Sequence, residues 1–411
     1  MAVIRPFCAV RPAVEYADKV AALPYDVYNR AEAKKEVERE PLSFLAIDRA
    51  ETQFEDSVSV YAPEVYAKAK ELFEERISQG IFVEDKQSAY YIYQLEMNGR
   101  TQTGIAACAS VDDYLDGTIK KHENTREEKE RDRIRHVDTL SAQTGPIFLA
   151  YRSQATINQL VSKIMETQEP LYDFVAADGI AHRMWKVTEE AVTTLQEAFA
   201  GIQEIYIADG HHRAASAVKV GLKRRKEHPD YDGTEEFNYF LSVLFPDDQL
   251  MIMDYNRCVK DLHGLTKEAF LKAVEECFDV TVLDGAKHPQ AKGQITMYLE
   301  NRWYLLQAKQ ELLAITDPVA ALDVSLLQEY LLKPVLGIED PRTDERIDFI
   351  GGIRGLEELE RRVKTDMTVA FAMYPTSIGE LFAVADAGLL MPPKSTWFEP
   401  KLRSGLLMHR I

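Results

Sequence analysis

The residues from 205 to 217, IYIADGHHRAASA, combine a short apolar run, a polar turn and a string of small side chains. The apolar run predicts a buried strand that ends at Asp209. Gly210 predicts a tight turn, and a helix is expected to begin with His211, His212 and Arg213 in its first turn. A helix N-terminus carries unpaired N–H groups and the positive end of the helix dipole, so this turn favours an anion.

Three hairpins and several amphipathic helices are expected around this segment. Asn98-Gly99 and Asp178-Gly179 each separate two strand-like runs, and QITMYLE (294–300) is followed directly by RWYLLQA (302–308). The pattern predicts helices over 63–79, 155–167, 188–200, 211–227, 266–277, 323–332 and 377–387, and strands over 145–151, 204–208, 237–245 and 250–255. These elements follow no regular βαβ rhythm, which favours an α+β fold with mixed sheets, hairpins and flanking helices.

We expect three parts along the chain. Residues 1–88 form an N-terminal segment that contributes to the site, and residues 89–256 form an α+β core that holds the polar motifs. Residues 257–411 form a C-terminal α+β domain whose MPPKST loop returns to the site.

Composition narrows the class of protein. The 411 residues carry 67 acidic and 49 basic side chains, a net charge of −18, which argues against broad binding to nucleic acid or to an anionic membrane. The four cysteines have no CxxC spacing, and no stretch approaches the roughly 20 apolar residues of a membrane span. We therefore expect a cytoplasmic protein without nucleic-acid or membrane partners, and its oligomeric state stays open.

A second dense polar segment, IKKHENTREEKERDRIRH, covers residues 119–136. Its residues 127–135 are interpreted as a solvated helical face with ion pairs one turn apart. The preceding side chains differ, because they offer a base, a magnesium ligand, an amide, a helix cap and an anion clamp: His122, Glu123, Asn124, Thr125 and Arg126.

Two chemistries compete for these polar residues. Asp209, His211 and His212, together with His122 and Glu123, offer the donor types of a hydrolytic zinc site. Alternatively, the turn and Arg213 hold a nucleotide phosphate while carboxylates bind magnesium and accept a proton. The planar guanidinium of Arg213 favours phosphate, and the HxH and HExxH spacings of zinc sites are missing, so phosphoryl transfer is preferred.

Two further segments are candidates for substrate contact. Tyr25 and Asp26 follow a proline in an otherwise apolar stretch. Near the C-terminus, a proline-stiffened loop carries Lys394, Ser395 and Thr396, which are able to reach a phosphate or a carboxylate.

Four segments together resemble a large microbial family known as domain of unknown function 1015: RPAVEYADKVAALPYDV (11–27), HENT (122–125), IADGHHRAASA (207–217) and MPPKSTWFEPKLRSG (391–405). The Asp-Gly-His-His-Arg turn also resembles the phosphate turn of the ParB/sulfiredoxin fold, which includes free-serine kinases. This resemblance implies a ParB/sulfiredoxin-like nucleotide-binding core in which Gly210, His211, His212 and Arg213 bind phosphates. The run Glu123-Asn124-Thr125-Arg126 is similar to the second conserved box of ParB.

The resemblance implies a kinase that phosphorylates free L-serine, or a similar amino acid, with ATP or ADP and Mg²⁺. Glu123 or Asp209 would be the general base and would bind magnesium, with His122 as a further catalytic candidate. Tyr25, Asp26, Lys394, Ser395 and Thr396 would contact the amino acid. Two alternatives stay open: a metal-dependent phosphoester hydrolase, such as a phosphoserine phosphatase, and a non-catalytic nucleotide-binding regulatory module.

Overall fold

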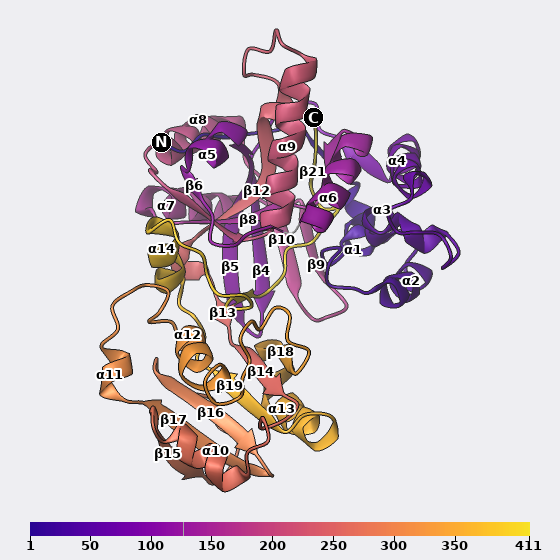
Figure 1. Cartoon of the computed structure of the whole chain (residues 1–411). Coiled ribbons are helices and arrows are strands. Elements are labelled where there is room, and N and C mark those ends of the chain that lie inside the picture. Colours follow the sequence, from indigo (N-terminus) through magenta and orange to yellow (C-terminus); the bar gives the residue numbers. More distant parts are fainter. Residues whose placement is uncertain (126) are drawn as a thin grey trace. The chain divides into compact units, whose positions relative to one another are not determined.

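The structure is a computed structural model that describes residues 1–125 and 127–411. The chain forms two compact units: Met1–Leu250 together with Pro400–Ile411, and Met251–Glu399. Both combine helices with sheets (Figure 1), which confirms the predicted mixed α+β class. The three-part division expected from the sequence stays a prediction.

A nine-stranded mixed sheet, counted over the described residues, is the centre of the first unit. Eight strands follow the order β6-β11-β8-β12-β5-β4-β10-β9, and β1 pairs with β5. In chain order the strands are β1 (Ile4–Arg5), β4 (Tyr91–Met97), β5 (Arg100–Ser110), β6 (Ile119–Lys120), β8 (Ile147–Tyr151), β9 (Tyr172–Val175), β10 (Ala181–Lys186), β11 (Ile205–Asp209) and β12 (Tyr239–Pro246). The side chains of Ile205–Ala208 are buried, so β11 lies within the core.

A smaller sheet joins the two ends of the chain. Its order is β3-β2-β21-β7, with β2 (Ala9–Pro12), β3 (Phe82–Glu84), β7 (Ala142–Gln143) and β21 (Met408–Arg410). The helices of this unit are α1 (Ala17–Val20), α2 (Arg30–Arg39), α3 (Leu45–Asp48), α4 (Pro63–Ser78), α5 (Val111–Asp116), α6 (Glu127–Leu140), α7 (Ala155–Thr167), α8 (Glu189–Ala200) and α9 (His211–Glu227).

Turn chemistry explains the hairpins. Asn98 and Gly99 have φ values of 53° and 75°, as a two-residue turn of the type that suits twisted strands requires, and they join β4 to β5. Gly179 has a φ of 81° in the turn between β9 and β10. Both hairpins were expected from the sequence, and both are confirmed.

Helix α9 packs against α6 (Figure 1). The face of α9 that follows the turn is built from the small buried residues Ala214, Ala215, Ser216 and Ala217, as the sequence predicts. Further along, a Cβ on Gly221 would lie 2.5 Å from the carbonyl oxygen of Phe237, so only glycine permits this close approach. The small residues thereby fix the start of α9 against its neighbours.

The second unit contains a six-stranded sheet in the order β15-β17-β16-β19-β14-β18, with every pair antiparallel. Its strands are β14 (Tyr255–Val259), β15 (Phe278–Leu283), β16 (Gln294–Leu299), β17 (Arg302–Ala308), β18 (Ile347–Gly351) and β19 (Val369–Met373), and β13 (Ile252–Met253) pairs separately with β20 (Trp397–Phe398). Its helices are α10 (Lys267–Val274), α11 (Gln310–Leu313), α12 (Asp323–Leu327), α13 (Gly355–Thr365) and α14 (Ile378–Asp386).

The predicted elements of this unit are partly confirmed. The β16–β17 hairpin is present, and α14 begins with the capping box of Ser377 and Glu380. The strand expected over 250–255 is instead divided between β13 and β14, because the Asp254 carbonyl accepts a hydrogen bond from Gly352 and the chain changes sheets there.

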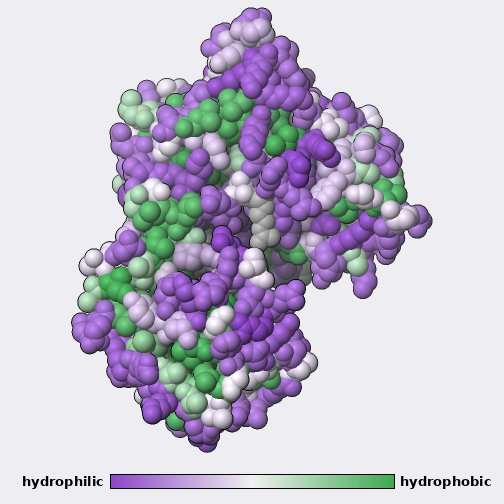
Figure 2. Space-filling view, viewed as in Figure 1, coloured by the Kyte–Doolittle hydropathy of each residue, from purple (hydrophilic) through white to green (hydrophobic). Residues whose placement is uncertain are grey.

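The visible surface is dominated by hydrophilic side chains with small scattered apolar areas (Figure 2), in keeping with the high content of charged residues. Among the helices of residues 1–125 and 127–411, none is long and apolar enough to span a bilayer.

Candidate functional site

The turn between β11 and α9 has the geometry that the sequence predicts. β11 ends at Asp209, Gly210 adopts a left-handed φ of 95°, and α9 begins at His211. No side chain caps this helix end. The backbone angle favours glycine, and a Cβ on Gly210 would lie 2.9–3.1 Å from the guanidinium of Arg213 and would displace it.

Asp209 is held by two cations. Its Oδ2 lies 3.3 Å from Nζ of Lys401 and 3.8 Å from Nη2 of Arg213, and its Oδ1 accepts the N–H of Gly210 at 2.9 Å. Burial acts to raise the pKa of Asp209, but Lys401 and Arg213 outweigh it and hold the pKa well below its usual range. Asp209 is therefore a carboxylate at neutral pH.

Arg213 lies beneath the turn with its side chain largely buried. Its Nη1 donates a hydrogen bond to the carbonyl of Pro146, and its Nη2 faces Asp209. The backbone carbonyl and Gly210 thus fix the guanidinium at the helix end, where an anion would bind.

Two buried histidines pack behind the turn. The rings of His122 and His211 are 4.4 Å apart and meet edge to face. The Nε2 of His211 accepts the backbone N–H of His122 at 3.4 Å, so its proton resides on Nδ1, which lies 3.7 Å from Oε2 of Glu123. The structure therefore brings His211 next to His122 and Glu123, although 89 residues separate His211 from His122.

Burial keeps both imidazoles neutral. It lowers the pKa of His122 to about 4, and burial together with the neighbouring His122 lowers the pKa of His211 well below its usual value. His122 bonds to the backbone of Ile207, whereas its Nδ1 is buried without a hydrogen-bond partner among the described residues. This nitrogen is an acceptor without a donor.

The remaining polar residues of the segment 122–126 do not all lie beside the turn. Asn124 is exposed, and the hydroxyl of Thr125 donates to Oε2 of Glu130 at 2.6 Å. Thr125 thus joins the α6–α9 contact, where Glu130 also pairs with Lys219. Arg126 lies outside the described residues, so its predicted role stays a prediction.

Helix α6 corrects part of the interpretation of residues 127–135 as a solvated face: Glu127, Glu128, Lys129, Arg131 and Arg135 are exposed as expected, but the face toward the core also carries charge. Glu130, Arg133 and His136 are buried. They recur every three residues, and with Val137 and Leu140 they form the inner face of the helix. Polar and charged side chains therefore lie on the buried face of this helix, where apolar residues are usual.

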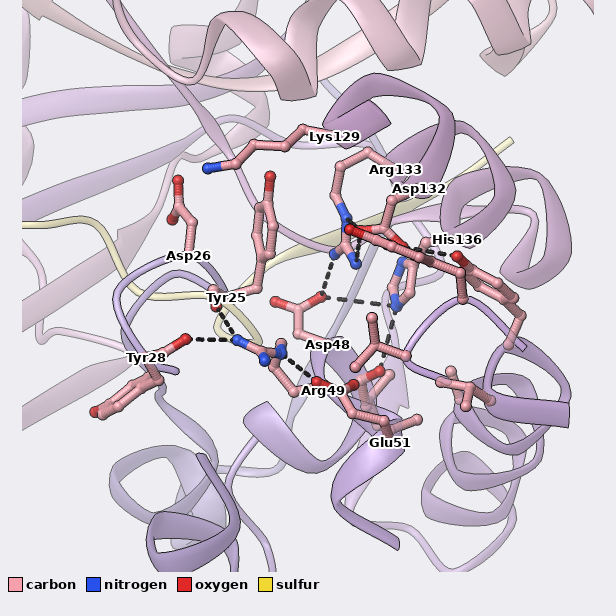
Figure 3. Close-up of a pocket in the computed structure, with 17 residues that line it drawn as sticks. Tyr25, Asp26, Tyr28, Asp48, Arg49, Glu51, Lys129, Asp132, Arg133 and His136 are labelled. Atoms are coloured by element: carbon pink, nitrogen blue, oxygen red, sulfur yellow. Dashed lines mark hydrogen bonds and ion pairs between the residues drawn. The ribbon is translucent and has the colours of Figure 1, made fainter. Parts of the chain in front are cut away.

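Tyr25 and Asp26 line a cavity of about 220 Å³ beside α6 (Figure 3). The guanidinium of Arg133 stacks on the Tyr25 ring, with Cζ 3.9 Å from the ring centre, and burial raises the pKa of Tyr25 to about 12. A second, smaller cavity shares Tyr25, Asp48, Arg133 and His136 with the first, and Arg213 also lines it. The predicted substrate residues Tyr25 and Asp26 therefore lie in a real cavity whose walls extend to the turn.

The C-terminal loop is divided between the units. Lys394, Ser395 and Thr396 lie in the second unit, where the hydroxyl of Ser395 donates to the carbonyl of Pro392. Their contact with the substrate stays a prediction. Lys401 and Arg403 belong to the first unit, and Arg403 donates to Nε2 of His182 at 3.2 Å and pairs with Asp178.

Sequence reasoning did not assign Asp48, Arg133 or His136 to this region. The three-residue spacing of Glu130, Arg133 and His136 places them on one helix face, but their residue types do not distinguish that face from a solvated one. Lys401 lies in the C-terminal segment 391–405 that the sequence singles out, but no local signal indicates its pairing with Asp209, because 192 residues separate the two.

Zinc ligation receives no geometric support. Within residues 1–125 and 127–411, no three His, Cys, Asp or Glu side chains are arranged to hold a metal ion. Magnesium sites differ, because the ion keeps several waters and binds one or two carboxylates plus substrate phosphates. Asp209 is ionised and lies at the helix end, so it offers one such carboxylate.

Comparison with known proteins gives distant structural relatives and one family. No curated protein sequence matches the chain. A free serine kinase in complex with AMP aligns with 15% identity and a TM-score of 0.35, covering 74% of this chain and 92% of that one. A conserved hypothetical protein from Pyrococcus furiosus aligns with 16% identity and a TM-score of 0.35, covering 74% of this chain and 94% of that one. C-terminally truncated SbnI from Staphylococcus aureus aligns with 11% identity and a TM-score of 0.37, covering 73% of this chain and 85% of that one. The model of the family described as "Protein of unknown function (DUF1015)" matches residues 4–325, and the chain therefore belongs to that family.

Proposed function

We propose that the protein is a nucleotide-dependent phosphotransferase that phosphorylates a small amino acid, with free L-serine as the acceptor. The observation that carries this proposal is the Asp209–Arg213 turn. It combines a glycine in the left-handed region, an uncapped start of a 17-residue helix and the guanidinium of Arg213. Backbone N–H groups and a fixed cation at one helix end suit the phosphates of a nucleotide.

In this proposal the first turn of α9 binds the phosphates of ATP or ADP. The N–H groups of His211, His212 and Arg213 lie in the first turn of the helix, and they would donate to phosphate oxygens. Lys401 and Arg213, both beside Asp209, would add positive charge around the anion. A magnesium ion held by Asp209, with Glu123 as a further ligand, would neutralise part of the phosphate charge.

The acceptor hydroxyl would attack the terminal phosphorus. The new bond joins the serine oxygen to that phosphorus, the bond to the bridging oxygen breaks, and ATP leaves as ADP or ADP as AMP. The serine proton passes to a carboxylate. Glu123 suits this role better than Asp209, because the lowered pKa of Asp209 makes it the weaker base.

His211 would orient Glu123 through its Nδ1–H, and the neutral His122 would support His211 from behind. Tyr25 and Asp26 would contact the amino acid in the cavity beside α6, and Lys394, Ser395 and Thr396 are proposed as further contacts.

The direct test is to incubate the purified protein with L-serine, magnesium and either ATP or ADP, and to measure phosphoserine by mass spectrometry. We expect phosphoserine in proportion to nucleotide consumed, and its loss in Glu123→Gln. Nucleotide binding without phosphorylation of any small amino acid would point instead to a regulatory module, and release of phosphate from phosphoserine without nucleotide would point to a hydrolase.

A further inference from the structure

The cavity beside α6 contains buried charges of both signs. Its wall comes from the turn at Tyr25 and Asp26, the end of α3, helix α4 and the inner face of α6 (Figure 3). Its volume of about 220 Å³ is below the roughly 300–1,000 Å³ of pockets for drug-sized ligands. A molecule of few heavy atoms fits this size better than a nucleotide does.

Arg133 is the buried cation of the cavity. Its Nε and Nη2 bind Oδ2 of Asp132 at 2.9 and 2.8 Å, and its guanidinium lies on the Tyr25 ring. Its Nη1 has only a long contact, 3.9 Å, to Oδ1 of Asp48. Within the described residues Nη1 forms no hydrogen bond, so its two protons are available to a ligand in the cavity.

Asp48 and His136 supply acceptors next to this cation. Oδ1 of Asp48 accepts the hydroxyl of Thr144 at 3.0 Å, whereas Oδ2 has no hydrogen bond within the described residues. Nε2 of His136 donates to the carbonyl of Ile47 at 3.2 Å, which leaves a lone pair on Nδ1. In Figure 3 the Asp48 carboxylate lies between the guanidinium groups of Arg133 and Arg49.

The cavity is also lined by a second pair of opposite charges. The Lys129 ammonium and the Asp26 carboxylate lie on the side to which the Tyr25 hydroxyl points (Figure 3). The cavity therefore offers donors and acceptors in separate places along one small space.

We propose that this cavity binds a small amino acid as its zwitterion, with the ligand carboxylate on Nη1 of Arg133 and its ammonium on Oδ2 of Asp48. A simple anion would leave Oδ2 of the buried Asp48 carboxylate without a partner, and a simple cation would leave Nη1 of Arg133 without one. A zwitterion pairs both. The adjoining cavity, lined by Arg213 as well as by Tyr25, Asp48, Arg133 and His136, connects this region with the phosphate turn. That the bound amino acid is the phosphoryl acceptor rests on the proposed function.

The test is calorimetric binding to the full chain without nucleotide. Glycine, L-alanine, L-serine and L-threonine would be compared with 3-hydroxypropionate, which lacks the ammonium, and ethanolamine, which lacks the carboxylate. We expect at least one amino acid to bind, and each serine analogue that lacks a charge to bind roughly tenfold or more weakly than serine. If no amino acid binds, or if either analogue binds as tightly as serine, the proposal is overturned.

Matched variants locate the binding. Arg133→Gln should weaken amino-acid binding roughly tenfold or more. Arg131→Gln, on the exposed side of the same helix with its side chain 65% exposed, should leave binding unchanged. Equal binding by the parent and a folded Arg133→Gln would contradict the proposal. Should Arg133→Gln fail to fold, the analogue series on the parent protein still decides.

The same experiments separate this inference from the proposed function. Amino-acid binding without any phosphorylation would leave the cavity assignment in place and remove the kinase. If Arg133→Gln forms phosphoserine with an unchanged KM for serine, the kinase function stands and the cavity assignment is removed.

Discussion

The turn at the start of α9 and the cavity beside α6 differ in how their charged and polar groups are arranged. At the turn, the donors are backbone N–H groups of a helix end, and one carboxylate, Asp209, lies between Lys401 and Arg213. In the cavity, side chains of opposite sign, Arg133 with Asp132 and Asp48, are buried against each other. The first arrangement suits a multivalent anion and the second a small zwitterion, so we assign different parts of the substrate pair to the two regions.

The largest expected effect concerns His122, behind the turn. Its pKa is lowered by burial to about 4 from an ordinary 6.5, so between these pH values the unfolded chain binds a proton that the folded chain does not. His122 alone should therefore lower the free energy of unfolding by about 3 kcal/mol as the pH drops from 6.5 to 4. Denaturant unfolding at a series of pH values measures this slope.

His122→Gln should reduce that acid sensitivity, whereas His228→Gln, an exposed histidine of the same unit, should not. An unchanged slope in His122→Gln would mean that the acid response originates elsewhere, for example at His136 in the cavity, whose pKa burial and Arg133 also lower.

Gly210→Ala should damage the turn and spare the cavity. The variant needs a left-handed backbone, at a cost of about 1–2 kcal/mol, and its Cβ displaces the Arg213 guanidinium. We expect nucleotide affinity to fall about tenfold or more while amino-acid affinity is retained, as measured by calorimetry. Gly99→Ala carries the same kind of backbone cost at a φ of 75° but has no atom within 4 Å of the added Cβ, and it should bind nucleotide normally. Equal nucleotide affinity in the two variants would contradict the role of the turn.

Lys401→Met should have the smallest effect. The partly exposed Lys401–Asp209 pair is worth no more than about 1 kcal/mol, so nucleotide affinity should fall only a few-fold. Removal of this cation should also move the pKa of Asp209 upward, and the acid limb of nucleotide binding should shift to higher pH. Lys223→Met, which removes the Asp138 pair near the far end of α9, is the control and should change neither quantity.

The two regions also differ in how far the sequence foretold them. The strand, glycine turn and helix around Asp209 were predictable, because adjacent histidines after a glycine stand out chemically and local rules fix the geometry. The inner face of α6 was not, because Glu130, Arg133 and His136 are the residue types of a solvated helix and only their tertiary partners bury them. The Lys401–Asp209 pair depends on a chain return of 192 residues, which no local pattern encodes.

The central claim is that Arg213 holds a nucleotide phosphate at the start of α9, and its most direct test is a calorimetric titration of ATP with magnesium into the parent and Arg213→Ala. The variant loses a hydrogen bond to Pro146, which costs about 1 kcal/mol of stability and leaves the fold intact. We predict that its affinity for ATP falls roughly tenfold or more while small amino acids still bind. An Arg213→Ala protein that binds ATP as tightly as the parent would contradict the account.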